Sequence, residues 1–217
     1  SIFSLGGGLI MLVALAQSFS PATLIPLHGS IQLANNFSRT LVYSEFFQWK
    51  LVKNILISTM FGAVIGIYLF GTLPENLLVM VIAATILFLT WAPLDSLIFS
   101  VMKNDWFCGF ISGFAGIFVG ANGPLVTAYL RTKNLSPEVL VANHGAIMIF
   151  QHGIKIILFA SFFNFMILDY FIFILILALT GYAGAILGRR LISKVPFKSF
   201  NIILKVFLTL LAFSLFF

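Results

Sequence analysis

The chain has 217 residues, of which 61% are hydrophobic and only 8% charged, with 26 phenylalanines and a formal net charge of +6. Soluble domains are far less apolar and far more charged, so this composition excludes a soluble globular protein. Uncharged runs long enough to cross about 30 Å of hydrocarbon, roughly 20 helical residues each, recur along the whole chain. They lack the alternation of barrel strands, and we therefore expect an all-α membrane protein with a single transmembrane domain over residues 1–217.

Turn residues divide these apolar runs into consecutive segments. The chain opens on SIFSLGGGLIML without an initiator Met or a basic region, so no signal peptide is visible and we expect further residues before Ser1. Ser20-Pro21 and Ser136-Pro137 are typical helix starts, because proline is tolerated in the first helical turn. The expected segments are 1–19, 20–42, 51–71, 76–98, 106–131, 136–163, 167–189 and 197–217.

The two halves of the chain share a sequence motif. SPATLIPLHGSIQ at 20–32 matches SPEVLVANHGAIM at 136–148, a shift of 136 − 20 = 116 residues, with Ser, Pro, Leu, His, Gly and Ile identical. We interpret the match as an internal duplication with a first repeat at 1–98 and a second at 106–217. A glycine cluster precedes each matched helix, GGG at 6–8 and GANGP at 120–124.

Each glycine cluster is predicted to break its membrane segment. Leu9 to Gln17 and Leu125 to Arg131 are too short to span, so each is expected to be a half-helix that starts near the midplane. Free N–H groups at such a start carry a partial positive charge of about half a unit, and glycine lets an anion approach them. The alternative is that the glycines only allow close helix packing. The substrate-binding residues predicted from these ends are Gly7, Gly8, Leu9, Asn122, Gly123 and Leu125.

Polar side chains within the apolar segments gather next to the two clusters. Helical spacing gives each half one polar face: His28, Gln32, Asn35 and Arg39 in the first, and His144, Gln151, His152 and Lys155 in the second. Ionisable groups in membrane segments are functional candidates by default, although a histidine can simply bond a neighbouring helix. We therefore add His28, Gln32, Asn143 and His144 to the substrate site, and assign Asn36, Arg39, His152 and Lys155 to the pathway.

Two cations in these segments align with each other. Lys155 matches Arg39 under the same shift, so the pair is expected near opposite mouths of one pathway, where each would attract anions. Arg39 can instead be a topology signal, and Lys155 can extend its amine to the outer interface. Lys205 lies inside the last segment, and the sequence suggests no role for it.

The basic residues of the loops favour a re-entrant second glycine segment. If every segment crosses, they divide four against six between the two faces. If 106–131 enters and returns at GANGP, all ten lie on one face, as the positive-inside rule requires, with Glu75 and Asp169 on the other. Three crossings per half then make the repeats inverted, as in many transporters. The ten are Arg39, Lys50, Lys53, Lys103, Arg131, Lys133, Arg189, Arg190, Lys194 and Lys198.

Enzyme and cofactor motifs are missing from the sequence. HExxH, GxSxG, Walker A and CxxC patterns do not occur, and three histidines without clustered carboxylates make a weak metal site. The single Cys108 cannot form an internal disulfide. We expect neither an enzyme nor a cofactor or metal, and we attribute the positive charge to membrane topology and not to a nucleic-acid partner.

The order of the motifs resembles the TauE/SafE sulfite exporter family, also described as the toluene-sulfonate uptake permease (TSUP) group. The resemblance covers nearly the whole chain, and its motifs are GGGLIMLVALAQSFSP, the connection with Arg39, Tyr43, Trp49 and Lys50, FGAVIGIYLFGTLP, GANGPLVTAYLRTKNLSP and GYAGAILGRRLISKVP. The chain departs from the family in having Asn-Gly-Pro where a Gly-Gly pair is commoner, and His-Gly where small hydroxyl residues are commoner.

The resemblance implies a multi-pass secondary transporter in a lipid bilayer, the bacterial cytoplasmic (cell inner) membrane. Its substrate would be a small sulfur-containing anion such as sulfite, sulfoacetate, thiosulfate or a similar organosulfonate. We expect export by alternating access around a midplane anion site, with protons as the coupling ion through the histidines. The alternatives are a channel-like passive anion conductor, uptake of a different small anion, and a non-transporting membrane subunit that binds partner proteins.

Overall fold

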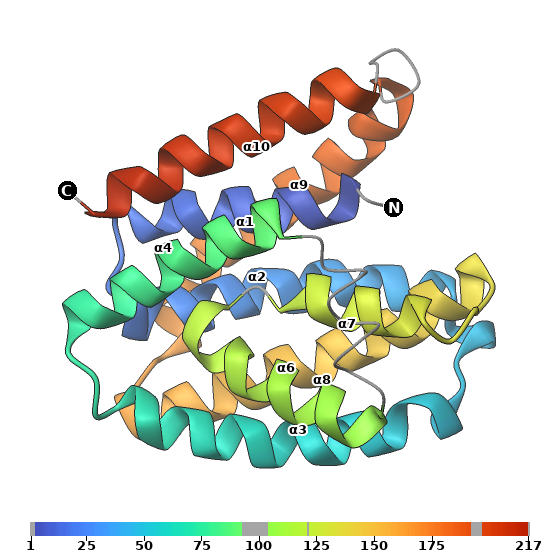
Figure 1. Cartoon of the computed structure of the whole chain (residues 1–217), viewed down its shortest axis with the longest axis horizontal. Helices are drawn as coiled ribbons and strands as arrows, with labels where there is room; N and C mark the ends of the chain where they lie inside the picture. Colours follow the sequence, from blue (N-terminus) through green and yellow to red (C-terminus); the bar gives the residue numbers. More distant parts are fainter. Residues whose placement is uncertain (1–2, 93–103, 121, 192–196, 217) are drawn as a thin grey trace.

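The computed structural model describes residues 3–92, 104–120, 122–191 and 197–216, leaving aside the side chains of 3–6, 38–39, 185–191, 197–201 and 216. Over these ranges the chain is helical and contains no strand, which confirms the all-α prediction. The helices are α1 (Phe3–Ala16), α2 (Pro21–Val42), α3 (Trp49–Phe70), α4 (Glu75–Trp91), α6 (Asp105–Val119), α7 (Gly123–Arg131), α8 (Pro137–Phe163), α9 (Phe171–Leu191) and α10 (Phe197–Phe213), with 3-10 turns at Ser44–Phe46, Ile167–Tyr170 and Ser214–Phe216 (Figure 1).

Three of the described helical stretches are long and apolar enough to cross a membrane. They are Trp49–Phe70, Pro137–Phe163 and Ile167–Gly184, and shorter apolar helices lie at Gly7–Ala16, Glu75–Trp91, Asp105–Val119 and Ile202–Phe213. Helix α2 has 22 residues but does not belong to this group, because His28, Gln32 and other polar residues lower its hydropathy. Its polar side chains His28, Ser30 and Asn36 are buried within the molecule.

Helices α2 and α8, which carry the duplicated motif, pack against each other in the centre of the molecule. Gly29 of α2 lies beside His152 and Lys155 of α8, whereas Gly145 near the start of α8 lies beside Thr40 near the end of α2. The two helices are therefore antiparallel, as Figure 1 shows. Both begin at the predicted proline, directly after Ser20 or Ser136.

Glycines allow α3 and α6 to pack closely in a parallel pair. A Cβ added at Gly113 of α6 would lie only 2.9 Å from the Cα of Thr59 in α3, and one added at Gly62 of α3 would lie 2.9 Å from the backbone N of Phe114. The hydroxyl of Thr59 donates a hydrogen bond of 3.2 Å to the carbonyl of Gly109 across the same seam. Small residues at such positions let membrane helices approach each other, so these glycines serve packing.

The predicted break at GANGP is confirmed. Helix α6 ends at Gly120, which adopts the left-handed conformation with φ 76° and donates its N–H to the carbonyl of Gly116 over 3.2 Å. Helix α7 starts at Gly123 with Pro124 in its first turn. A left-handed glycine ends a helix readily, and proline has no N–H for the preceding turn, so the two residues together separate α6 from α7.

The α6–α7 pair forms a hairpin whose two ends lie together. Tyr129, in the last turn of α7, donates a hydrogen bond of 2.6 Å to the carboxylate of Asp105 at the start of α6. Lys133, just after α7, forms an ion pair with the same carboxylate at 3.1 Å. The chain thus enters at one end of the bundle, turns at the Gly120 break and comes back to the same end (Figure 1).

The predicted break at the first glycine cluster is wrong. Helix α1 runs without interruption from Phe3 to Ala16, so Gly7, Gly8 and Leu9 lie beyond its first turn. Their N–H groups are used by the helix and are not offered to a ligand. The first cluster contains no proline, and among the described glycines only Gly120 has a positive φ. Glycine alone costs a helix about 1 kcal/mol per residue, which flanking apolar packing can offset.

Helices α4 and α10 meet through Lys205, for which the sequence suggested no role. The Nζ of Lys205 lies 4.9 Å from the centre of the Trp91 ring, and the indole N–H of Trp91 donates a hydrogen bond of 2.9 Å to the hydroxyl of Thr209. A lysine over an aromatic face is stabilised by the ring quadrupole. Lys205 therefore joins the end of α4 to α10.

Candidate functional site

Lys155 is buried at the break between α6 and α7. Only 1% of its surface is exposed, and its Nζ donates a hydrogen bond of 3.0 Å to the carbonyl of Gly120. This carbonyl belongs to the C-terminal end of α6, which carries partial negative charge. Among the described residues the ion pair is Lys133 with Asp105, and no carboxylate pairs with Lys155. The expectation of Lys155 near a mouth is wrong, because the amine turns inward to the broken helix end.

Two buried amides connect the break to the helices around it. Asn122, at the start of α7, donates through Nδ2 to the carbonyl of Ser112 in α6 over 2.9 Å and to Oε1 of Gln151 in α8. Gln151 donates through Nε2 to the hydroxyl of Ser112 over 2.8 Å and to that of Thr59 in α3 over 3.0 Å. One hydrogen-bond network therefore holds α3, α6, α7 and α8 together.

The direction of these bonds follows from the groups involved. The Ser112 carbonyl can only accept, so Asn122 must present its NH₂ group to it, and the same NH₂ group must face Oε1 of Gln151. The Oδ1 of Asn122 then lies on the other side of the amide, buried and without a hydrogen-bond partner in the described part of the molecule. Few buried acceptors in folded proteins remain unpaired, so this one needs an explanation.

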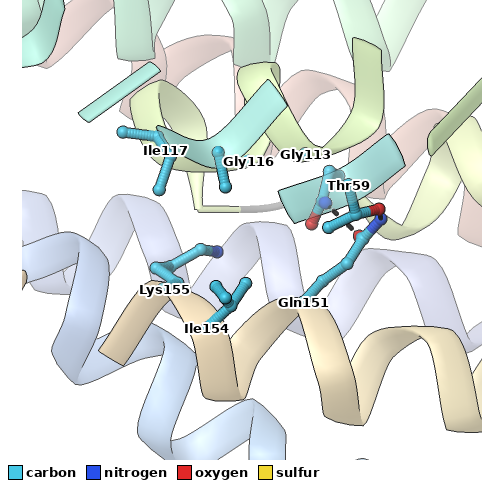
Figure 2. Close-up of a pocket in the computed structure, with 9 residues that line it drawn as sticks. Thr59, Gly113, Gly116, Ile117, Gln151, Ile154 and Lys155 are labelled. Atoms are coloured by element: carbon cyan, nitrogen blue, oxygen red, sulfur yellow. Dashed lines mark hydrogen bonds between the residues drawn. The ribbon is translucent and has the colours of Figure 1, made fainter. Parts of the chain in front are cut away.

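A small space beside the glycines of α6 is lined by the polar residues Thr59, Asn122, Gln151 and Lys155. Ser112 bonds Asn122 and Gln151, and we call these five residues the Lys155 cluster. Figure 2 shows Gln151 and Lys155 extending from α8 toward Thr59, Gly113 and Gly116. A Cβ added at Gly116 would lie 2.8 Å from Nδ2 of Asn122, so glycine leaves room for this amide. The space does not admit a water molecule, and the cluster is closed in this conformation.

The two histidines of the duplicated motif make matching contacts. His28 donates from Nε2 to the carbonyl of Gly8 over 3.0 Å, and His144 donates from Nε2 to the carbonyl of Gly123 over 3.3 Å. Each bond joins the histidine to the glycine cluster of its own half, 20 and 21 residues earlier. The third histidine, His152, packs its ring against His28 at 6.4 Å between centroids. All three rings are buried in the region of the break.

The other predicted residues of the first half lie at varying distances from this region. Gln32 approaches His28 with its Nε2 at 3.5 Å and lies against Gly8, and Asn36 bonds the Gln32 carbonyl over 2.8 Å. Leu9 belongs to the apolar core, and Gly7 is exposed with nothing near its Cα face. The side chain of Arg39 lies outside the described residues. Gln32 therefore lies beside His28 with Asn36 one turn further along α2, whereas Gly7 is exposed, and the roles predicted for these residues stay predictions.

Asn143 and Leu125 make structural contacts away from the Lys155 cluster. Asn143 accepts a hydrogen bond of 2.9 Å from the backbone N–H of Gln48 and donates to the carbonyls of Phe46 and Val139 over 3.3 and 2.7 Å. Its side chain thus holds the loop between α2 and α3 and does not line the cluster, which corrects its predicted place. Leu125 packs on a separate apolar core.

Sequence reasoning missed Thr59 and Ser112, which complete the Lys155 cluster. The sequence contains only a weak indication that these two hydroxyl residues belong to the site. Ser112 directly precedes Gly113 in an otherwise uncharged run, and Thr59 is part of a Ser-Thr pair in an apolar segment. Small hydroxyl residues beside glycines are common in membrane helix contacts, where they donate across the interface. The register of α3 against α6 was needed to bring both hydroxyls to Gln151.

The comparison with known proteins agrees with the motifs. The family model described as "Sulfite exporter TauE/SafE" matches residues 1–215, and no curated protein or solved structure matches the chain. This family consists of membrane transporters for sulfite and related sulfur anions, which are not enzymes. With its apolar helices, the chain is a multi-pass membrane protein. Because the match covers essentially the whole chain, the protein belongs to the sulfite exporter TauE/SafE family.

Proposed function

We propose that this protein is a secondary transporter that exports a small sulfur-containing anion across the bacterial cytoplasmic membrane by alternating access. Sulfite, sulfoacetate, thiosulfate and similar organosulfonates are the candidate substrates, and the Lys155 cluster is the proposed binding site. The observation that carries the proposal is the buried amine of Lys155, whose described partner is a backbone carbonyl and not a carboxylate.

The charge of Lys155 explains why an anion would bind there. A buried ammonium group without a counter-ion is costly, and an anion beside it removes most of that cost. The hydroxyls of Thr59 and Ser112 and the amide of Gln151 can reorient to donate to oxyanion oxygens, and the hydrogen bonds from the charged amine of Lys155 are the strongest of these. The start of α7 lies at the same break, and its partial positive charge offsets the partial negative charge of the α6 end.

The closed packing of the cluster favours a carrier over an open channel. The space beside Lys155 does not admit water in this conformation, so an anion can enter only when helices move apart. The Gly120 break is the natural place for such a movement, since the chain is not helical there. Gating by a moving broken helix is typical of secondary transporters.

We further propose that the two halves form inverted repeats. Three observations support this arrangement: α2 and α8 are antiparallel, α1 and α7 run in opposite directions in Figure 1, and His28 and His144 bond the glycine clusters of their own halves. Inverted halves can exchange conformations and so expose a central site to either face. The three buried histidines make protons the proposed coupling ion, because an imidazole can both accept and donate a proton.

The test is transport by the purified protein in proteoliposomes, with sulfite and thiosulfate as the anions. We expect saturable transport by the wild type and its loss in Lys155→Met, because the site loses its cation. Lys205→Met is the matched control, since Lys205 is also a lysine in an apolar helix but packs on Trp91. No transport of either anion by the wild type would overturn the proposed function, and full activity of Lys155→Met would remove this residue from the site.

A further inference from the structure

The unpaired Oδ1 of Asn122 indicates that the ligand carries a hydrogen-bond donor in addition to its negative charge. Asn122 is 2% exposed, its NH₂ group is fully used by Ser112 and Gln151, and its Oδ1 is a buried acceptor without a partner in the described structure. The neighbouring space is too small for a water molecule to supply the missing donor in this conformation. A ligand that carries an O–H group would supply it.

The net charge at the break is close to a single positive charge when the amine is protonated. The C-terminal end of α6 and the N-terminal end of α7 meet there, and their partial charges of about half a unit have opposite signs. Lys155 then contributes the remaining charge. The titratable groups facing the cluster are Lys155 and His152 on α8 and His28 on α2, with His144 nearer the start of α8. A doubly charged ligand would leave one negative charge unbalanced in a buried site.

We propose that the Lys155 cluster selects a singly charged oxyanion that retains one O–H group, with hydrogensulfite as the member of the sulfur class that fits. Lys155 would bind the charged oxygens, and Oδ1 of Asn122 would accept the hydrogen bond from the O–H. The inference rests on the proposed function and narrows its substrate from sulfur anions in general to the hydrogen-bearing monoanion. Asn122 is then the residue that determines specificity.

A pH series on the wild type tests the charge of the ligand. Sulfite loses its second proton near neutral pH, whereas methanesulfonate is a singly charged anion of similar shape throughout and has no O–H group. We expect the total sulfite concentration that gives half-maximal transport in proteoliposomes to rise toward alkaline pH in step with the loss of hydrogensulfite. The methanesulfonate series reports the effect of titrating His28, His144, His152 and Lys155 in the protein. The ratio of the half-maximal concentrations of the two anions at each pH therefore isolates the effect of protonating the ligand.

The outcomes of the pH series separate this inference from the proposed function. A half-maximal sulfite concentration that stays constant relative to methanesulfonate, or falls toward alkaline pH, overturns the selection of the monoanion and leaves anion transport standing. If neither anion is transported at any pH, both proposals are overturned. The series uses only the wild type, so it tests the selection of the monoanion even if a substituted protein does not fold.

The variant Asn122→Ala tests the O–H bond itself. At mildly acidic pH we expect the wild type to prefer hydrogensulfite over methanesulfonate by about tenfold, the usual effect of one hydrogen bond. Asn122→Ala should reduce this preference to within about twofold, because both anions then lack the acceptor. The control is Ser30→Ala, which removes a buried hydroxyl bonded to Pro26 over 2.9 Å and should keep the preference. An unchanged preference in Asn122→Ala overturns the assignment of this residue.

Discussion

The hydroxyl of Tyr129 donates a hydrogen bond of 2.6 Å to the carboxylate of Asp105, and this bond closes the α6–α7 hairpin at the end away from its break. Lys133 reinforces the closure, because it pairs with Asp105 and its Nζ lies 5.0 Å from the centre of the Tyr129 ring. The two halves of the segment 106–131 are thus fixed at one end and meet Lys155 at the other.

Loss of the Tyr129 hydroxyl is expected to destabilise the hairpin. Tyr129→Phe leaves the Asp105 carboxylate with one donor fewer, and a hydrogen bond to a charged group contributes about 1.5–3 kcal/mol to stability. We expect a lower unfolding midpoint in detergent than for the wild type. Tyr68→Phe is the control, since Tyr68 is 62% exposed and packs against Phe162, and its midpoint should stay unchanged. Equal midpoints for both variants would show that the bond contributes nothing.

The hairpin also predicts which loops share a side of the membrane. Single cysteines at Asn104 and Asn134, which flank the hairpin, should be labelled by an impermeant thiol reagent from the same side. A cysteine at Asp169 should be labelled from the opposite side only, because it follows the full length of α8. The native Cys108 is buried and should give little background. Labelling of Asn104→Cys and Asn134→Cys from opposite sides would contradict the re-entrant arrangement.

The close seam between α3 and α6 predicts opposite effects for two glycine substitutions. Gly113→Ala puts a Cβ 2.9 Å from the backbone Cα of Thr59, and such overpacking costs about 1–3 kcal/mol of stability. Gly153→Ala, in α8, meets nothing within 4 Å and should stabilise its helix by up to about 1 kcal/mol. Thermal unfolding of both variants against the wild type measures the difference. A Gly113→Ala protein as stable as Gly153→Ala would show that the seam can relax.

The sequence was sufficient to predict the helices and one of the two breaks. Ser-Pro pairs locate the starts of α2 and α8, and Pro124 with a glycine just ahead of it predicts where α6 and α7 separate. The triple glycine of α1 led to a wrong prediction of a second break, because glycine destabilises a helix but does not force it to end. Local chemistry predicts a break only where a residue cannot adopt the helical backbone or donate its N–H.

The candidate site could be predicted only in part, because its residues come together through tertiary register. The spacing of His28, His152 and Lys155 correctly gave polar faces on α2 and α8 that meet. The spacing could not show how deep Lys155 lies, since a lysine stem can extend its amine to an interface or fold it inward. Thr59 joins the cluster only because α3 is parallel to α8 and in register with Gln151.

Asn143 and Gln151, two buried amides of α8, are expected to differ in function. Asn143→Ala removes three hydrogen bonds to the loop at Phe46–Gln48 and to α8, which should make that loop more sensitive to protease and lower the unfolding midpoint. The substrate concentration for half-maximal transport should stay unchanged, because Asn143 does not reach Lys155.

Gln151→Ala should have the reverse profile, with a higher substrate concentration for half-maximal transport and little change in cleavage of the 43–48 loop. Gln151 is the residue that connects Asn122 to the hydroxyls of Thr59 and Ser112, so its loss leaves the amide of Asn122 free to turn away from the break. Transport kinetics and limited proteolysis of the two variants, measured side by side, check the assignment. If Asn143→Ala alone weakens the apparent affinity, the binding site lies at the α2–α3 loop and not at the break.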